Sequence, residues 1–338
     1  MGFQISFIQC NTEFQHLVLE AVSEWKNSVE FYTVQTSGST GTPKSINLKR
    51  TQLVASAERS NAFFNLNETS TVLLCLSPKT IAGKMILIRA LVGNYAVDVV
   101  EPTSNPLMHL PTNKTYDFAS LVPFQLHRIL EETPYSIELF KTILLGGMPL
   151  SLETEKNLMQ FNCTFYMGFG MTETVSHIAI REVGKISYSC MNGVTISINE
   201  NCCLIINDKC LNIEKLVTTD VIKMLSPNEF IWMGRNDFVI NSGGIKIHPE
   251  QIERTISKHI TGDFIVSYEY DSTLHQKCIL ISCNPISDEV KQIISQAIKT
   301  HFNKYAIPKK YICSPIIRRE NGKIDRIKTR NLIADESK

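Results

Sequence analysis

One stretch of nine residues decides the fold prediction: Thr36-Ser37-Gly38-Ser39-Thr40-Gly41-Thr42-Pro43-Lys44. It follows Phe31-Tyr32-Thr33-Val34, whose aromatic and β-branched side chains favour a strand. Glycines let the backbone bring its N–H groups close to an oxyanion, hydroxyls add neutral donors, and Lys44 adds a positive charge. The stretch is therefore suited to holding a polyphosphate. It is not a Walker A loop, because Thr42 and Pro43 separate the second glycine from the lysine, and alone it could equally be a Ser/Gly-rich surface turn.

Three later stretches decide between these interpretations. They are Phe169-Gly170-Met171-Thr172-Glu173, then Gly234-Arg235-Asn236-Asp237 with Gly243-Gly244, and finally Asn321-Gly322-Lys323. In this order, and together with the first stretch, they resemble the motifs of the adenylate-forming superfamily of acyl-CoA synthetases, adenylation domains and luciferases. Any one motif is a weak signal. Four ordered matches that span nearly the whole chain are a strong one.

The spacing of apolar runs predicts an α/β fold. Largely apolar, strand-like runs at 71–76, 97–100, 142–145 and 163–166 are separated by helix-length segments, as in a covered, mostly parallel sheet. From 186 to 231 the spacing is shorter, and Asn192-Gly193 is a hairpin signal, so a small antiparallel β subdomain is expected. We therefore predict a large N-terminal domain over 1–236 and a small, mobile α+β C-terminal domain over 237–338.

Helix signals support this organisation. Asn11 or Thr12 can cap a first helix, and a second is expected over 51–63. In the C-terminal part, Pro249 fits the first turn of a helix, and Ser287 fits the cap of another.

Composition excludes several classes of function. Hydrophobic content of 43% and charged content of 20% are ordinary for a soluble globular protein, and a net charge of +1 gives no electrostatic case for nucleic acid or an anionic membrane. No apolar run is long enough to span a bilayer, and the N-terminus lacks the pattern of a signal peptide. Ten cysteines without a C-x-x-C pair are expected to be reduced thiols of a cytoplasmic protein. The sequence leaves a monomer and a homodimer both open.

The resemblance implies a site that activates a carboxylic acid with ATP. Its ATP-binding residues would be Thr36, Ser37, Gly38, Ser39, Thr40, Gly41, Lys44, Gly147, Phe169, Gly170, Met171, Asp220 and Arg235. Its catalytic residues would be Thr172, Glu173 and Lys323, with Glu173 as the ligand of Mg²⁺, a hard cation that prefers carboxylate oxygens. Without the motifs, Glu173 would be an ordinary solvated acid and Lys323 one more lysine of a basic tail.

The second half of the reaction is implied by the same resemblance. Asp237 matches the hinge about which the small domain turns after adenylation. Gly243 and Gly244 would then let the pantetheine arm of CoA pass close to the backbone. The sequence departs from the family at Thr219, where most members have glycine before the aspartate that matches Asp220.

Two further stretches point to the acid. Ile81-Ala82-Gly83-Lys84 and Gly170–His177 look like those of short o-succinylbenzoate–CoA ligases of menaquinone biosynthesis. Their substrate has two carboxylates, so a cation or donor is expected for the one that is not activated. Lys84, which interrupts an apolar run without an obvious partner, and His177 are the predicted substrate contacts, with Arg89 and Arg181 as further candidates. A snorkelling lysine and a satisfied core histidine are about equally good interpretations.

The expected function is therefore ATP-dependent adenylation of o-succinylbenzoate and transfer to CoA, giving o-succinylbenzoyl-CoA, AMP and pyrophosphate. One alternative is another small-acid CoA ligase, or an adenylation enzyme that loads a carrier protein. A non-catalytic nucleotide binder is a different class, and the presence of both Glu173 and Lys323 argues against it.

Overall fold

The computed structural model describes residues 2–35, 45–319 and 322–336 of the chain. Within these ranges the α-helices are α1 (Thr12–Lys26), α2 (Arg50–Phe64), α3 (Ile81–Gly93), α4 (Pro123–Glu132), α5 (Leu152–Leu158), α6 (Pro249–Ile256), α7 (Asp288–His301) and α8 (Arg326–Glu336). The short 3-10 helices are η1 (Pro134–Leu139), η2 (Thr172–Thr174), η3 (Asn236–Phe238), η4 (Ser257–His259) and η5 (Lys304–Ala306). No helix of this part of the chain is long and apolar enough to cross a bilayer.

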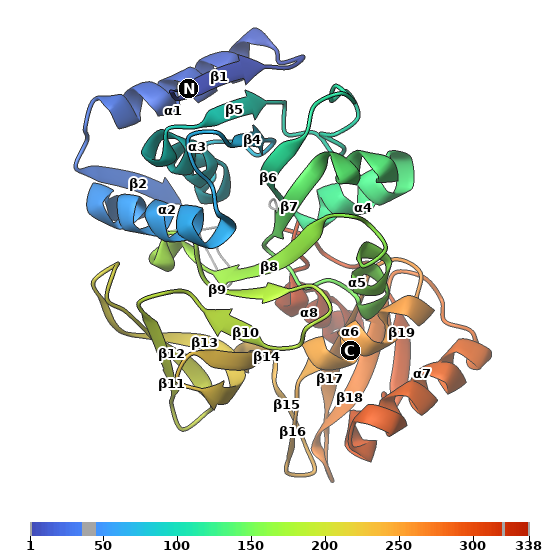
Figure 1. Cartoon of the computed structure of the whole chain (residues 1–338). Coiled ribbons are helices and arrows are strands. Elements are labelled where there is room, and N and C mark those ends of the chain that lie inside the picture. The colour runs from blue at the N-terminus through green and yellow to red at the C-terminus, as the bar shows by residue number, and fades with distance from the viewer. Residues whose placement is uncertain (1, 36–44, 320–321, 337–338) are drawn as a thin grey trace.

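The largest sheet has the strand order β1-β5-β4-β6-β7-β8-β9-β10-β14-β13-β12-β11 (Figure 1). Its strands are β1 (Gln4–Phe7), β4 (Thr71–Leu74), β5 (Ala96–Val99), β6 (Tyr116–Leu121), β7 (Phe140–Leu145), β8 (Thr164–Gly170), β9 (His177–Glu182), β10 (Tyr188–Cys190), β11 (Val194–Ile198), β12 (Cys203–Asp208), β13 (Ile213–Ser226) and β14 (Glu229–Arg235).

The first half of this sheet is parallel, which confirms the predicted architecture. Each neighbouring pair from β1 to β8 pairs in parallel. Side chains alternate between two apolar clusters: Leu73 and Ile143 pack with α4 and α5, whereas Val72 and Leu144 pack with α1 and α3. Because both faces are covered, the strands read as continuous apolar runs.

Beyond β8 the same sheet continues with antiparallel strands. The antiparallel strands were predicted, but they extend the large sheet and do not form a sheet of their own. The predicted hairpin at Asn192-Gly193 is wrong: a turn is present, but the flanking strands β10 and β11 pair with other strands, β10 with β9 and β14, and β11 with β12. β10 pairs with the preceding strand β9 and β11 with the following strand β12, so the turn at Asn192-Gly193 connects two hairpins and does not form one.

Two smaller sheets complete the described structure. The strands β2 (Phe31–Gln35) and β3 (Ser45–Lys49) form an antiparallel pair. The C-terminal part holds β15 (Ile240–Ser242), β16 (Ile245–Ile247), β17 (Phe264–Asp271), β18 (His275–Ser282) and β19 (Lys310–Cys313). These strands share an apolar cluster with α6 and α7. The division of the chain between 236 and 237 stays a prediction.

The predicted helix starts are confirmed at atomic level. The side chain of Asn11 accepts a hydrogen bond from the Phe14 backbone at the start of α1, and Ser287 accepts one from Val290 at the start of α7. Pro249 occupies the first turn of α6, where its missing N–H costs no helical hydrogen bond. The second predicted helix is observed as α2.

Candidate active site

The predicted phosphate loop lies between two paired strands. Thr36, Ser37, Gly38, Ser39, Thr40, Gly41 and Lys44 lie outside the described residues, so no contact of theirs is assigned. The residues that flank them, Gln35 and Ser45, are register partners of β2 and β3. The two ends of the loop segment are therefore neighbours. Strand β3 contacts η2, which contains Thr172 and Glu173. The structure brings the base of the loop next to the second predicted motif.

The turn from β8 to β9 carries this second motif. Gly170 pairs with His177, and a Cβ at Gly170 would overlap with the carbonyl oxygen of Ser176. Thr174 fixes the turn, because its hydroxyl bonds both the N–H and the carbonyl of Met171 at 3.0 Å. Val175 is buried with φ of +64°, an unusual conformation for a β-branched residue. The sequence thus folds into a tight, strained turn.

This turn displays the predicted catalytic side chains. Glu173 is exposed and Thr172 is half-buried. In the described structure no hydrogen bond or ion pair occupies the Glu173 carboxylate, and no cluster of three His, Cys, Asp or Glu side chains forms a ready metal site. Glu173 alone therefore fits a cation that takes most of its ligands from phosphate and water, as Mg²⁺ does.

Phe169 and Gly147 lie at the carboxyl ends of neighbouring strands. β7 and β8 pair through Leu145 and Met167, so the turns that follow them meet at one edge of the sheet. Gly147 has φ of +101°, and a Cβ there would meet open space. The half-buried ring of Phe169 packs edge-to-face on Phe230, with ring centroids 5.2 Å apart. At this edge of the sheet, the ring of Phe169 is supported by Phe230, and the backbone turn at Gly147 has open space beside it.

Asp220 and Arg235 are register partners on β13 and β14. Trp232 donates its indole N–H to Asp220 Oδ1 at 2.8 Å. Burial raises the pKa of Asp220, whereas the Trp232 hydrogen bond and the Arg235 charge oppose the rise. Arg235 bonds the hydroxyl of Thr219 and the Asp237 carboxylate, the latter at 3.1 Å. Thr219, the departure from the family pattern, thus orients Arg235.

Lys323 lies near Arg235 although 88 positions separate them in the printed numbering. Burial, followed by the positive charges of Arg235 and Arg319, lowers the pKa of Lys323. Its carbonyl accepts a hydrogen bond from the Arg319 N–H at 2.9 Å, which closes a turn at Gly322, where φ is +78°. Asn321 lies outside the described residues. The structure therefore brings the predicted catalytic lysine to the Asp220–Arg235 end of the site.

The predicted CoA-binding glycines form the turn between β15 and β16. Gly243 and Gly244 both have positive φ, of +56° and +79°. A Cβ at Gly244 would meet open space, whereas one at Gly243 would lie 3.2 Å from the ring of Tyr305. Asp237, the predicted hinge, sits in η3 directly before this hairpin.

The prediction that Lys84 has no partner is wrong. Its ammonium pairs with Glu24 of α1 at 3.0 Å and lies 5.4 Å from the ring centre of Tyr32. Arg181 is also satisfied, because it makes two bonds to Glu155 and one to the Lys185 carbonyl. Neither pairing is visible in the sequence, since the partners are distant along the chain.

His177 lies in a buried polar cluster between α2, α3 and β9, which we call the arginine–histidine cluster: Ser56, Arg59, Ser60, Arg89, Ser176 and His177. His177 Nε2 lies 3.1 Å from Ser60 Oγ, and Nδ1 lies 3.2 Å from Ser176 Oγ. Burial, together with the charges of Arg89 and Arg59, lowers the pKa of His177 well below its usual value. The imidazole is therefore neutral at pH 7.

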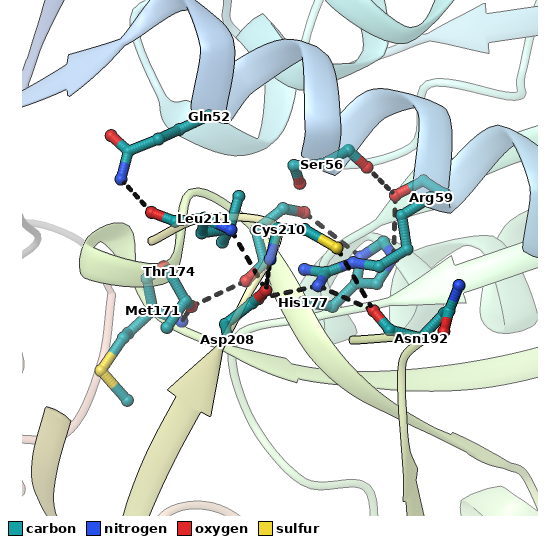
Figure 2. Close-up of polar contacts among 12 residues, drawn as sticks. Gln52, Ser56, Arg59, Met171, Thr174, His177, Asn192, Asp208, Cys210 and Leu211 are labelled. Carbon is teal, nitrogen blue, oxygen red and sulfur yellow. Dashed lines mark hydrogen bonds and ion pairs between the residues drawn. The ribbon is translucent and has the colours of Figure 1, made fainter. Parts of the chain in front are cut away.

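Two arginines of this cluster keep unused donors. Arg89 donates to Ser176 Oγ at 2.7 Å, but its buried Nε has no partner among the described residues. Arg59 pairs with Asp208 at 2.7 Å, and its Nε and Nη2 likewise lack partners in the described structure. Figure 2 shows Ser56 and Arg59 projecting from α2 towards His177 and Asp208. Arg89 is 3% exposed, and burial lowers its pKa to about 10, so it stays charged at neutral pH.

Ser60, Ser176, Arg59 and Asp208 were missed by the sequence analysis. Arg59 had a detectable signal, because it stands on a face of the predicted second helix that also carries small residues. The other three are ordinary polar residues whose role depends on neighbours from distant segments.

Fold and site together define an adenylate-forming enzyme of the α/β type. The family model described as AMP-binding enzyme matches residues 15–208, and the chain belongs to this AMP-binding family of the adenylate-forming superfamily.

Individual relatives agree with this assignment. A 2-succinylbenzoate–CoA ligase of Staphylococcus epidermidis (strain ATCC 12228 / FDA PCI 1200) is 27% identical and is matched over 90% of this chain and 70% of its own length. The ligase of the same name from Staphylococcus aureus (strain Newman) is 28% identical, and the chain spans 61% of it. An acyl-CoA synthetase (AMP-forming)/AMP-acid ligase II-like protein from Dyadobacter fermentans is similar in structure, with 30% identity, a TM-score of 0.64 and 96% coverage of both chains.

A second solved structure supports the fold. The o-succinylbenzoate coenzyme A synthetase of Bacillus subtilis, in complex with ATP and magnesium ion, has a TM-score of 0.76 at 22% identity. The match covers 88% of this chain and 69% of that one.

Proposed function

We propose that this protein is an AMP-forming acid–thiol ligase that adenylates o-succinylbenzoate with ATP and then transfers the acyl group to CoA. The observation that carries the proposal is the arginine–histidine cluster directly behind the Thr172–Glu173 turn. A buried guanidinium with an unused donor suits a substrate carboxylate better than an apolar acid. The names of the Staphylococcus relatives support the same substrate.

In the proposed adenylation step, one end of the site holds ATP. The segment 36–44 would hold the β- and γ-phosphates, and Gly147, Phe169, Gly170 and Met171 would border the adenine. Asp220 would accept hydrogen bonds from the ribose hydroxyls, with Arg235 beside it. Bound Mg²⁺ would neutralise phosphate charge, and the exposed carboxylate of Glu173 is the residue that would hold it.

Two donors would act on the α-phosphate. Thr172 faces the reaction from the turn after β8, and Lys323 reaches it from the C-terminal part. A donor that meets charge as it develops at the α-phosphate lowers the barrier without tightening the ground state. The acid's carboxylate attacks the α-phosphorus, the bond to pyrophosphate breaks, and an acyl-adenylate forms.

The acid would lie between this α-phosphate and the arginine–histidine cluster. The succinyl carboxylate is activated, and the ring carboxylate would accept hydrogen bonds from Arg89. Neutral His177 can donate from one ring nitrogen only while the other accepts, and its two serine neighbours fix which one. Lys84, which is paired with Glu24, is no longer the leading candidate for this contact.

For the second step, the part of the chain after Asp237 would turn about this residue and withdraw Lys323. Gly243 and Gly244 would then line the path of the pantetheine thiol, which attacks the acyl-adenylate and releases AMP. The predicted division into 1–236 and 237–338 belongs to this proposal.

A second candidate is a ligase for another small acid with two carboxylates, or an adenylation enzyme that loads a carrier protein. The arginine–histidine cluster favours an acid with two carboxylates for both of these enzymes. They differ from the first proposal only in the acid or in the thiol that accepts the acyl group. A non-catalytic binder would not need Lys323 beside Arg235.

The test is release of AMP and pyrophosphate with ATP, Mg²⁺ and CoA, using o-succinylbenzoate beside benzoate, acetate and a medium-chain fatty acid. We expect turnover with o-succinylbenzoate that requires CoA. Turnover with a different acid would keep the mechanism and refute the substrate. ATP binding without turnover on any acid would refute the ligase assignment.

A further inference from the structure

Helix α6 lies beside β14, the strand of the large sheet that ends at Arg235 (Figure 1). Gln251 Nε2 donates to the carbonyls of Trp232 and Met233 on β14, at 2.9 and 3.1 Å. Glu250 Oε1 accepts from the Arg235 N–H at 3.2 Å. These bonds place α6 against the strand that carries Arg235.

Arg254, one turn further along α6, contacts a buried carboxylate on α5. Its guanidinium lies 2.8 Å from Glu155 Oε1, and the same oxygen accepts a bond from Arg181 Nη2 at 2.8 Å. Glu155 is 4% exposed, whereas the Arg254 side chain is 20% exposed. Arg254 is therefore the outer member of the triad and the only one that lies after Asp237.

The apolar face of α6 has a different attachment. Ile252 and Ile256 are fully buried in a cluster whose members all lie between Ile240 and Tyr311. In the described structure α6 thus belongs to the C-terminal part by its apolar contacts and reaches the N-terminal part by polar ones. Polar contacts can be exchanged for water at small cost, whereas exposure of the isoleucines would be expensive.

The same helix also holds the segment of Lys323. Glu253 pairs with Arg326, three residues beyond Lys323, and its other oxygen accepts from the Val266 N–H. A continuous path therefore runs from Glu155 and β14, through α6, to Arg326 and Lys323.

We propose that Arg254 and Gln251 are positioning residues that hold the C-terminal part in the orientation in which Lys323 lies beside Arg235. This inference rests on the proposed function, since it assigns that orientation to the adenylation step. When the C-terminal part turns, the contacts of Arg254, Gln251 and Glu250 with the N-terminal part must break, while the Ile252 and Glu253 contacts persist. Arg254 and Gln251 thus set how often the adenylating orientation is populated.

The test compares the two half-reactions in the full-length chain. Arg254→Ala leaves Glu155 with both bonds to Arg181, so it removes the contact without leaving an unpaired buried carboxylate. We expect single-turnover formation of acyl-adenylate to slow about fivefold to tenfold, in line with loss of a partly buried ion pair. Thioester formation from supplied acyl-adenylate should be unchanged or faster, and Arg254→Lys should restore part of the first rate.

Arg128→Ala is the matched control. Like Arg254, Arg128 forms ion pairs with glutamate, but its partners Glu131 and Glu132 lie with it on the exposed face of α4. It should change neither half-reaction. Equal slowing of both half-reactions in Arg254→Ala would show a merely structural role and would overturn the proposal.

A second measurement does not depend on any substrate. Amide hydrogen exchange in the ligand-free protein should be faster over 230–237 and 249–256 in Arg254→Ala and Gln251→Leu than in wild type or Arg128→Ala. Unchanged exchange would overturn the positioning role even if the ligase assignment holds. Faster exchange in a protein that activates no acid would support the contact and refute only the proposed function.

Discussion

Arg89 is the residue that most narrows the choice of acid. It is buried and charged, it bonds Ser176, and in the described structure no carboxylate pairs with it. A buried charge without a counter-ion is costly, and a substrate carboxylate would offset that cost on binding. On the proposed function, the protein would gain specificity for an acid with two carboxylates from an arrangement that is unfavourable without substrate.

Arg89→Gln removes this charge and should raise KM for o-succinylbenzoate by roughly 30-fold to 1,000-fold, the range for breaking a buried charge pair. Binding of benzoate, which has no second carboxylate, should be affected little. Steady-state kinetics with o-succinylbenzoate, and inhibition of that reaction by benzoate, measure the difference. Lys84→Gln discriminates between Arg89 and Lys84 as the contact of the second carboxylate. A larger rise in KM from the substitution at Lys84 than from the one at Arg89 would support Lys84, as the sequence predicted.

Lys323→Ala should slow acyl-adenylate formation by roughly 100-fold to 1,000-fold, as removal of a preorganised donor to developing charge usually does. Thioester formation from supplied acyl-adenylate should survive. Rapid-quench measurement of each half-reaction tests this, and adenylation at the wild-type rate would contradict the assignment.

The pH dependence of the same step follows from the lowered pKa of Lys323. The ammonium loses its proton at a lower pH than an ordinary lysine, so adenylation should decline on the alkaline side earlier than a pKa of 10.5 would give. Lys323→Arg keeps its charge and should move this decline to higher pH. A decline at the same pH in both proteins would show that another group titrates.

At the scale of elements, the beginning of α6 carries an unusual acid. Burial raises the pKa of Glu250 from 4.5 to about 7, and its Oε2 lacks a hydrogen-bond partner in the described structure. Glu253 raises the pKa further, whereas Arg326 and the N–H of Arg235 oppose it. The carboxylate also explains Gly234, where a Cβ would overlap with Oε2.

Glu250→Gln should make stability less dependent on pH. Between pH 4.5 and 7 the folded protein keeps a proton that the unfolded chain has lost, so the wild-type free energy of unfolding falls as pH rises. Glutamine cannot titrate and still offers an oxygen to Arg235. Relative to wild type, the free energy of unfolding of the variant should therefore rise by up to about 3 kcal/mol between pH 4.5 and 7. Urea denaturation at several pH values measures it, and a constant difference would contradict the raised pKa.

The elements differ in how well the sequence predicts them. Helices α1 and α7 were predicted because their caps and apolar faces are local in sequence. Strand β6 was missed because Asp117 and Ser120 interrupt its apolar residues, whereas the other covered strands were predicted from continuous apolar runs. The Asn192-Gly193 hairpin was wrong because β10 pairs with the preceding strand β9 and β11 with the following strand β12, so this turn connects two hairpins.

The residues of the candidate site also differ in how well the sequence predicts them. The residues predicted to bind the nucleotide stand in short motifs, and the structure places Lys323 near Arg235. The residues proposed to contact the acid do not form a motif. Lys84 could not be excluded from sequence because its partner, Glu24, lies on another helix, and Ser60 could not be found because only the fold places it against His177.

At the scale of the whole molecule, Glu155 connects α5, β9 and α6. Glu155→Gln would leave Arg181, which is 3% exposed, without its carboxylate and should lower the free energy of unfolding by about 3 to 5 kcal/mol. Arg254→Ala removes only the outer arginine and should cost about 1 kcal/mol or less. Chemical denaturation of both variants tests the contrast. Equal losses would show that the inner pair contributes no more than the outer one.

The strand order of the large sheet also determines when the protein can fold during synthesis. Among the described strands β1 pairs with β5 alone, so during synthesis β1 stays unpaired until Ala96–Val99 has been made. The proposed adenylation site would need β13 and β14 as well, which are the last strands of the large sheet to be made. Long-range pairing of this kind slows folding and leaves apolar strands exposed meanwhile. On the proposed function, a nascent chain would acquire its nucleotide site only after β14 has been made, and ATP would stabilise only chains that have reached this length.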